Sequence, residues 1–390
     1  MNAEVISLGC RMNIAESDSI RTMLAGEADI VVINSCAVTA EAVRHTRQAI
    51  RRARRARPDA RLLVTGCAAD IEREQLAAMP EVDGLVANSR KLDARSWNVP
   101  IASRTVAPKH TRAFVPVQNG CDHSCTFCII PQGRGASRSL AVPAVLREIE
   151  RHLERGAREV VLTGVDLTSW GQDLTDEPRL GMLVQAILDT FPELCRLRLS
   201  SLDGVEIDEL LFELLAGDER LLPYVHLSLQ HGHDMILKRM KRRHSRADAM
   251  RLVERLRVSR QDITIGADLI AGFPTEDESM HEANRSIVRE LGIVHGHIFP
   301  YSLRPGTPAA RMPQVDKATI KARSVELRGD VARQRNAWLE SLIGTELTVL
   351  SEADGTGHAG NFARVRTPEG TTAGAIVSVT PGKVEEGLLQ

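Results

Sequence analysis

Short β-branched runs alternate with helical stretches over roughly the first 95 residues. The runs are EVISLG, IVVIN, RLLVTG and GLVAN, and the helical patterns between them cover 17–25, 40–56 and 71–79. Such alternation is typical of a parallel sheet with crossover helices. We therefore expect an α/β protein whose first domain, residues 1–96, is an open parallel sheet.

A second, longer α/β series follows. Its candidate strands are FVPVQ, VVLTGV, RLRLSS, YVHLSLQ, ITIGADLIAGF and HIFPYS, and its helical patterns lie near 142–155, 181–189, 206–216, 246–259 and 277–290. Six strands with crossover helices predict a partial (β/α)6 barrel within residues 107–337, with its chemistry at the carboxyl ends of the strands. The Pro-bearing stretch 97–112 is interpreted as a linker.

The last part of the chain changes character. A long helix is expected from 316 to 343, and Gly344 is a typical residue to end it. The runs TELTVL, FARVRT and AGAIVSV, broken by glycines, then predict a small antiparallel β-barrel as a third domain, residues 338–390.

Composition narrows the functional classes. Hydrophobic residues at 43% and charged residues at 26% exclude a disordered chain, and no apolar run reaches the roughly 18 residues of a membrane span. With no charged and apolar leader, the sequence favours a cytoplasmic protein, in which seven cysteines indicate metal binding or catalysis and not disulfides. A net charge of −1 restricts any nucleic-acid contact to local basic patches.

Three cysteines, Cys10, Cys36 and Cys67, each follow one of the first three predicted strands. Ligands collect at the carboxyl ends of strands in open α/β sheets, so these thiols can converge on one site. The alternative is that they are small buried hydrophobic residues, and this is how we interpret Cys195.

The strongest motif is CDHSCTFC, in which Cys121, Cys125 and Cys128 lie on one short loop. Three thiolates can hold three corners of a cubane cluster and leave one iron open to a small molecule, whereas electron carriers use a fourth cysteine. A zinc site that adds His123 or His110 is the alternative.

These residues resemble a known family. The cysteine spacing, with Phe127 before the last thiol, is similar to that of radical S-adenosylmethionine (SAM) enzymes, and QNGCDHSCTFCIIPQGRG, SLGCRMNIAES, NSCAVT and TGCAA resemble the methylthiotransferases. With LTGVDL, HLSLQ, LKRMKRRHSR, DLIAGFPTE and FPYSLRPGTPAARMP the resemblance covers essentially the whole chain. The last five runs look most like the branch that acts on N6-threonylcarbamoyladenosine at position 37 of tRNA.

The resemblance implies two 4Fe-4S clusters and SAM as cofactors. In the family, residues matching Cys121, Cys125 and Cys128 hold the cluster whose open iron binds SAM and forms a 5′-deoxyadenosyl radical. Residues matching Cys10, Cys36 and Cys67 hold a second cluster that carries the sulfur. A radical suits adenine C2, because the hydrogen there is not acidic enough for a general base.

Other cofactor contacts are expected at strand ends. Thr163 and Gly164 match backbone that approaches SAM in the family, with a tight turn as the alternative. Asp268 and Gly272, on or after the fifth barrel strand, are candidates to border cofactor or substrate, and so is Gln230 at the end of the fourth. Relatives continue after Gln230 with Ser-Gly, whereas this chain has His231-Gly232.

Two basic runs are candidate tRNA contacts, although each could be a solvated face. The first is an arginine stripe at helical spacing, and the second is crowded within nine residues; from them we select Arg51, Arg54, Arg55, Lys241, Arg242 and Arg243. The C-terminal β-domain resembles the family's RNA-binding barrel, but from 346 onward it holds six acidic and three basic residues, so packing on the central barrel is the alternative role.

We therefore expect a monomeric tRNA methylthiotransferase that also needs an electron donor and a sulfur donor. The same chemistry on isopentenyladenosine-37 or on a ribosomal-protein aspartate is one alternative. A non-catalytic iron-sulfur protein that binds RNA or transfers electrons is the other.

Overall fold

A computed structural model describes residues 3–99 and 111–390. Most of the predicted linker, and His110 with it, lies outside these ranges. The chain forms two compact units. Unit 1 consists of residues up to 99 together with 119–138 and 302–307, and unit 2 of 111–118, 139–301 and 308–390.

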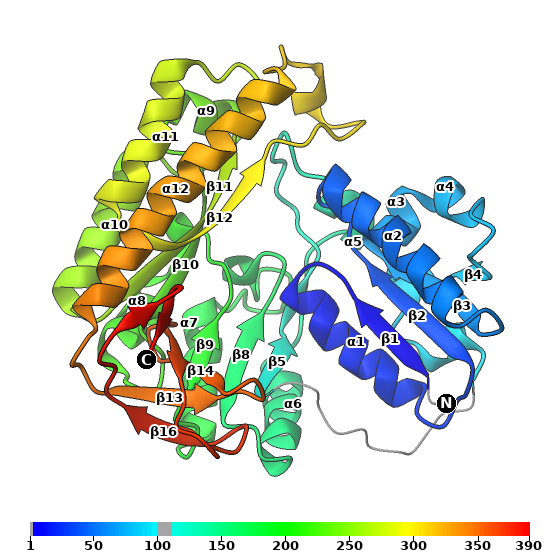
Figure 1. Cartoon of the computed structure of the whole chain (residues 1–390), viewed down its shortest axis with the longest axis horizontal. Helices are drawn as coiled ribbons and strands as arrows, with labels where there is room; N and C mark the ends of the chain where they lie inside the picture. The colour runs from blue at the N-terminus through cyan, green and yellow to red at the C-terminus, as the bar shows by residue number, and fades with distance from the viewer. Residues whose placement is uncertain (1–2, 100–110) are drawn as a thin grey trace. The chain divides into compact units, whose positions relative to one another are not determined.

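Unit 1 is built on a parallel sheet of order β1-β2-β3-β4 (Figure 1). Its strands are β1 (Glu4–Ser7), β2 (Ile30–Ser35), β3 (Arg61–Gly66) and β4 (Gly84–Leu85). Its helices are α1 (Arg11–Met23), α2 (Ala40–Ala56), α3 (Cys67–Ile71), α4 (Arg73–Ala77) and α5 (Ile130–Arg134). One apolar cluster packs α1 and Trp97 on one face of the sheet, and a second packs α2 and α3 on the other. Cover on both faces explains why the central strands β2 and β3 are continuous apolar runs, IVVI and LLV, without alternation.

Helix α1 differs from its prediction, since it begins at Arg11 and not near 17. Its buried face carries Asn13, Glu16 and Ser17, which are all less than 3% exposed. A search for apolar periodicity cannot recognise a buried polar face. The predicted helix 71–79 is likewise replaced by the shorter α3 and α4.

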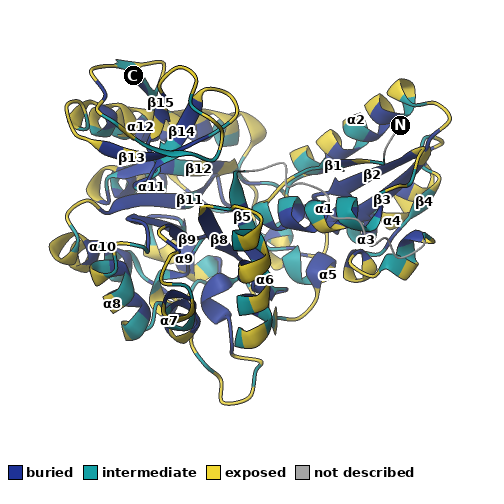
Figure 2. Ribbon diagram, turned by 90° about the horizontal axis from the view of Figure 1, so that it is seen from below, coloured by how far each residue is buried: buried dark blue, intermediate teal, exposed yellow. Residues whose placement is uncertain are grey.

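Unit 2 contains the predicted partial barrel. Two three-stranded parallel sheets, β5-β8-β9 and β10-β11-β12, are joined by a parallel bridge between Leu202 and Leu227 (Figure 1). The strands are β5 (Arg112–Pro116), β8 (Glu159–Thr163), β9 (Leu197–Leu199), β10 (Tyr224–Gln230), β11 (Thr264–Ala271) and β12 (Ile293–Pro300). The crossover helices are α6 (Val142–Glu154), α7 (Leu180–Thr190), α8 (Glu209–Gly217), α10 (Arg246–Ser259) and α11 (Glu278–Glu290), and a short α9 (Asp234–Arg239) follows β10. Figure 2 shows the strands buried and the outer helix faces exposed.

The long helix α12 (Lys317–Ser341) leads from the barrel to a six-stranded sheet of order β16-β13-β14-β15-β18-β17. The strands are β13 (Leu347–Ser351), β14 (Thr356–Ala359), β15 (Arg364–Arg366), β16 (Ile376–Val379), β17 (Val384–Glu385) and β18 (Leu388–Leu389). All pairs are antiparallel except β15 with β18, so the sheet is mostly and not wholly antiparallel.

This C-terminal sheet packs on the barrel. The buried Glu159 carboxylate accepts a hydrogen bond from Arg196 and one from Arg198, at 2.9 Å each. Both guanidinium groups then donate to backbone carbonyls of residues 348 and 358–360. The C-terminal sheet thus makes the contact with the barrel that the sequence analysis gave as an alternative to RNA binding. Among the described helices none is long and apolar enough to cross a membrane.

Candidate active site

The three strand-end cysteines of unit 1 lie at one edge of its sheet. Cys10 precedes α1, Cys36 follows β2 and Cys67 begins α3. The parallel register, with Ser7 opposite Asn34 and residue 35 opposite 66, brings these strand ends level. Cys36 and Cys67 are buried and Cys10 is exposed. The fold therefore brings the three cysteines to one edge of the sheet, while their sharing of one metal centre stays a prediction.

The thiols influence one another electrostatically. Burial, reinforced by the neighbouring Cys10 and Cys67, raises the pKa of Cys36 to about 11. Burial also raises the pKa of Cys67, which the nearby cations Arg134 and Lys91 oppose. Buried thiols that resist ionisation yet lie beside cations suit a metal centre, because metal binding displaces the thiol protons.

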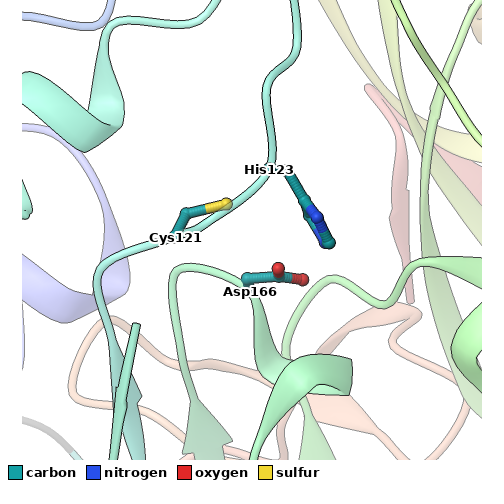
Figure 3. A group of neighbouring side chains, drawn as sticks. All are labelled: Cys121, His123 and Asp166. Carbon is teal, nitrogen blue, oxygen red and sulfur yellow. The ribbon is translucent and has the colours of Figure 1, made fainter. Parts of the chain in front are cut away.

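The second trio, Cys121, Cys125 and Cys128, lies on the loop that enters α5, also in unit 1. All three are half-buried. Figure 3 shows the side chains of Cys121 and His123 on this loop. The loop begins at Gly120, directly after the short strand β6 (Gln118–Asn119). The φ of Gly120 is +80°, and a Cβ there would lie 1.9 Å from the carbonyl oxygen of residue 136. Only glycine fits there.

A buried polar network ties this loop to the sheet. Arg134 donates to Glu16 Oε1 at 2.9 Å and to Asn13 Oδ1 at 2.7 Å, while Lys91 Nζ donates to Glu16 Oε2 at 2.5 Å. Burial alone would raise the pKa of Glu16, but the two cations lower it. The sequence analysis did not identify these four residues. Their polar or charged side chains become informative only once the fold shows that these positions are buried.

Close packing accompanies the network. Gly133 lies so near Cys67 that a Cβ on the glycine would be 3.2 Å from the cysteine Cβ. Gly9 lies even closer to Cys36, since a Cβ on this glycine would be 2.7 Å from the cysteine Cβ. There is therefore little room for larger side chains around Cys36 and Cys67.

In unit 2, Thr163 ends β8 and Gly164 begins the turn that follows. The Gln118 side-chain oxygen accepts hydrogen bonds from the N–H groups of residues 165 and 166, at 3.0 and 2.9 Å. A Cβ on Gly164 would lie 3.1 Å from that oxygen. The backbone at this strand end is thus fixed, while its contact with SAM stays a prediction.

The loop after β11 is organised by Glu276. Its carboxylate accepts from the N–H groups of Gly272, at 2.8 Å, and Phe273, at 3.0 Å. Burial would raise the pKa of Glu276, but hydrogen bonding to His231 and His281 lowers this pKa to about 2. This chain has His231 where relatives have serine, and the buried pair of His231 with Glu276 explains the difference. The distance from His231 Nε2 to Glu276 Oε2 is 3.3 Å.

The remaining cofactor candidates lie along the same strands. Gln230 ends β10 with a φ of +69°. Asp268 is in mid-strand, and one of its oxygens accepts from both His226 and His297 at 3.0 Å each. These histidines were not among the predicted site residues. Whether Gln230 and Asp268 contact cofactor stays a prediction.

The candidate RNA contacts fall into two groups. Arg51, Arg55 and Lys241 are exposed. Arg54, Arg242 and Arg243 instead direct their donors at protein: Arg54 binds Asp83 and backbone carbonyls, and the other two bind Asp203. These guanidinium groups therefore hold neighbouring segments of their own chain together. A role in RNA binding stays a prediction for all six.

Cys195 is exposed, so its interpretation as a buried hydrophobic residue is wrong. The β-rich pattern around it predicted a strand from 196, but β9 begins at Leu197, and Cys195 lies just before it on the preceding loop.

Sequence comparisons agree with this geometry. The Radical SAM superfamily matches residues 115–286, and the family described as "Uncharacterized protein family UPF0004" matches residues 2–87. The threonylcarbamoyladenosine tRNA methylthiotransferase MtaB of Rickettsia prowazekii is 41% identical over all of this chain and 97% of its own length. MtaB of Aquifex aeolicus is 33% identical over 88% of this chain and 91% of its own. A tRNA-2-methylthio-N(6)-dimethylallyladenosine synthase of Cereibacter sphaeroides is also 33% identical, over 89% and 86%.

Solved structures show the same fold. The radical SAM methyltransferase TsrM of Kitasatospora setae superposes with a TM-score of 0.54, over 77% of this chain and 66% of its own, at 17% identity. The barrel and the three-cysteine loop define a radical SAM enzyme. With a relative that matches from end to end, the chain belongs to the radical SAM methylthiotransferases. Membership implies a 4Fe-4S cluster and SAM, and suggests a second cluster.

Proposed function

We propose that this enzyme transfers a methylthio group to C2 of N6-threonylcarbamoyladenosine at position 37 of tRNA. The observation that carries the proposal is the 41% identity with a relative of that name over the full length of this chain. The reaction also requires an electron donor and a sulfur donor, and we expect the chain to act as a monomer.

The two cysteine trios have separate roles in this proposal. Cys121, Cys125 and Cys128 would hold one 4Fe-4S cluster, and Cys10, Cys36 and Cys67 would hold the other. Three ligands each leave one iron open in both. When bound, the clusters and SAM supply the electron, the radical and the sulfur.

The chain's own residues hold and orient these groups. Arg134 places a cation beside the thiols of the N-terminal trio, which favours their ionised, metal-binding form. The fixed backbone at Thr163 and Gly164 is proposed to face the amino group of SAM. Gly272 and Gln230 are proposed to border the same cofactor, and the exposed Arg51, Arg55 and Lys241 to contact tRNA phosphates.

Iron counting tests the cluster assignment. Anaerobic reconstitution should load about eight irons per chain. Cys10→Ala and Cys121→Ala should each lose about half, while Cys195→Ala, a matched change at a cysteine in neither trio, should lose none. Loss of a trio residue with no change in iron content would discard the two-cluster proposal.

Product analysis tests the acceptor. The reconstituted enzyme is given anticodon stem-loop RNAs that carry either threonylcarbamoyladenosine or dimethylallyladenosine. A third sample contains the ribosomal-protein substrate. Mass spectrometry then identifies the product nucleosides of the RNAs and the product peptides of the protein. We expect methylthiolation of the first only. Turnover of another acceptor in its place, or no cleavage of SAM to 5′-deoxyadenosine under reductant, would contradict the proposal.

A further inference from the structure

The interior of the barrel carries an unusual layer of side chains. Alternate residues of β10, β11 and β12 pack outward into the apolar core under the helices. The intervening residues point to the concave side: Tyr224, His226, Ser228, Gln230, Gly266, Asp268, Ile270, His295, His297 and Phe299. Among these inward side chains only the histidines can become cations.

The amino-terminal end of this interior is closed by the C-terminal sheet. Phe362 stacks on Tyr224 with ring centroids 4.9 Å apart and an interplanar angle of 18°, and it meets His295 edge-on at 5.4 Å. The Arg198 guanidinium carbon lies 4.8 Å from the centre of the Phe362 ring. Phe362 therefore forms a floor, and the interior is reached from the carboxyl ends of the strands, where barrel enzymes place their chemistry.

Directly above the floor, three side chains form a hydrogen-bonded chain. Tyr224 Oη lies 2.7 Å from His226 Nδ1, and His226 Nε2 lies 3.0 Å from Asp268 Oδ1. The same oxygen lies 3.0 Å from His297 Nδ1. Asp268 and His297 are direct partners in the β11–β12 register, so the strands themselves set this contact.

The histidines differ in accessibility. His226 is buried with both ring nitrogens engaged, whereas the side chain of His297 is 59% exposed. Asp268 orients the His297 ring through Nδ1, so Nε2 is the ring nitrogen that a substrate in the barrel can contact. With an N–H on each ring nitrogen, His297 can donate to Asp268 through Nδ1 and to a second carboxylate through Nε2.

We propose that His297 is a specificity-determining residue that binds the carboxylate of the threonyl group of the acceptor nucleoside, with Asp268 as its positioning residue. This inference rests on the proposed function. A threonylcarbamoyl group carries a carboxylate and a hydroxyl, whereas a dimethylallyl group offers no hydrogen-bond acceptor. A site built to hydrogen-bond a polar substituent discriminates strongly against a substrate that lacks it.

The test couples one side chain to one substrate group. Reconstituted wild-type enzyme and His297→Phe are each given stem-loop RNA with threonylcarbamoyladenosine, and the same RNA with the threonyl carboxylate as its methyl ester. Wild type should prefer the acid by roughly 10- to 100-fold in kcat/KM, as for a charge-assisted hydrogen bond. His297→Phe should reduce that preference to about one. His152→Phe, on the outer helix α6, is the matched control and should keep it.

Fluorescence anisotropy measures the binding of the two RNAs and so tests the preference without turnover. The variant His297→Gln retains a neutral hydrogen-bond donor and should show an intermediate preference for the acid. The inference is overturned if His297→Phe discriminates acid from ester as wild type does. Failure of the proposed function looks different, because wild type would then make no product from the threonylcarbamoyl RNA at all.

Discussion

Replacement of Arg134 by methionine should weaken the attachment of the loop 119–138 to the N-terminal sheet. The guanidinium donates to Glu16 at 2.9 and 3.2 Å, to Asn13 at 2.7 Å and to Asn119 at 2.9 Å. The Arg134 and Glu16 side chains are only 3% and 2% exposed. Removing one partner of a buried ion pair costs about 3–5 kcal/mol. Because Lys91 still neutralises Glu16, we expect a value near the lower end.

Hydrogen–deuterium exchange of the iron-free protein measures this cost locally. Peptides from α1 and from the loop 119–138 should open about a hundredfold more readily in Arg134→Met, the equivalent of about 3 kcal/mol. Peptides from the C-terminal sheet serve as an internal reference. Arg138→Met, which removes an exposed arginine from the same loop, should change exchange by less than about 0.5 kcal/mol.

A double variant separates the pair from its parts. If Arg134 acts through Glu16, then Glu16→Gln combined with Arg134→Met should cost clearly less than the sum of the single changes, since no uncompensated carboxylate stays buried. Additive costs, or an Arg134→Met protein that exchanges like Arg138→Met, would refute the reasoning.

Three further outcomes are expected. Gly272→Ala should lower stability by about 1–3 kcal/mol in urea unfolding, since φ is +71° and the new Cβ would lie 2.5 Å from Ile320 Cγ1; an unchanged midpoint would contradict this. The pKa of Glu276 is lowered from 4.5 to about 2, so its contribution to stability is complete above pH 4.5 and is lost as the pH falls toward 2. Wild type should therefore lose more stability than Glu276→Gln between these two pH values. Parallel curves of stability against pH for the two proteins would contradict this. In iron-free protein a maleimide should label the exposed Cys195 well before the buried Cys36, whose pKa is raised, and mass spectrometry of peptides would reveal the reverse order.

The elements predicted best are those whose pattern matches what they bury. Helix α2 begins and ends where predicted, at 40 and 56, because its apolar residues recur on one face, and β10 spans the predicted YVHLSLQ. Helix α5 was missed because it is a single buried turn with two glycine or proline positions in its short sequence. Strand β14, TGHA, has no β-branched run at all and forms through its neighbours β13 and β15.

The candidate site shows the same division. The cysteines were predicted because their spacing and strand-end positions have chemical meaning without a structure. Partners such as Arg134 with Glu16, or His226 with Asp268, become visible only when the fold brings distant segments together, since a buried charge looks like any surface charge in a sequence. Arg54 is the converse case, because an arginine in a basic stripe is used to bind carbonyls of its own chain.

The assignment of the loop 119–138 to unit 1 has a mechanical consequence. This loop leaves the barrel sequence after residue 118 and returns at 139, yet its contacts are with α1, α3 and the segment near Asn88. All six cysteines of the two trios consequently belong to one folded unit. The spacing between the two trios is therefore set by the folding of unit 1 itself.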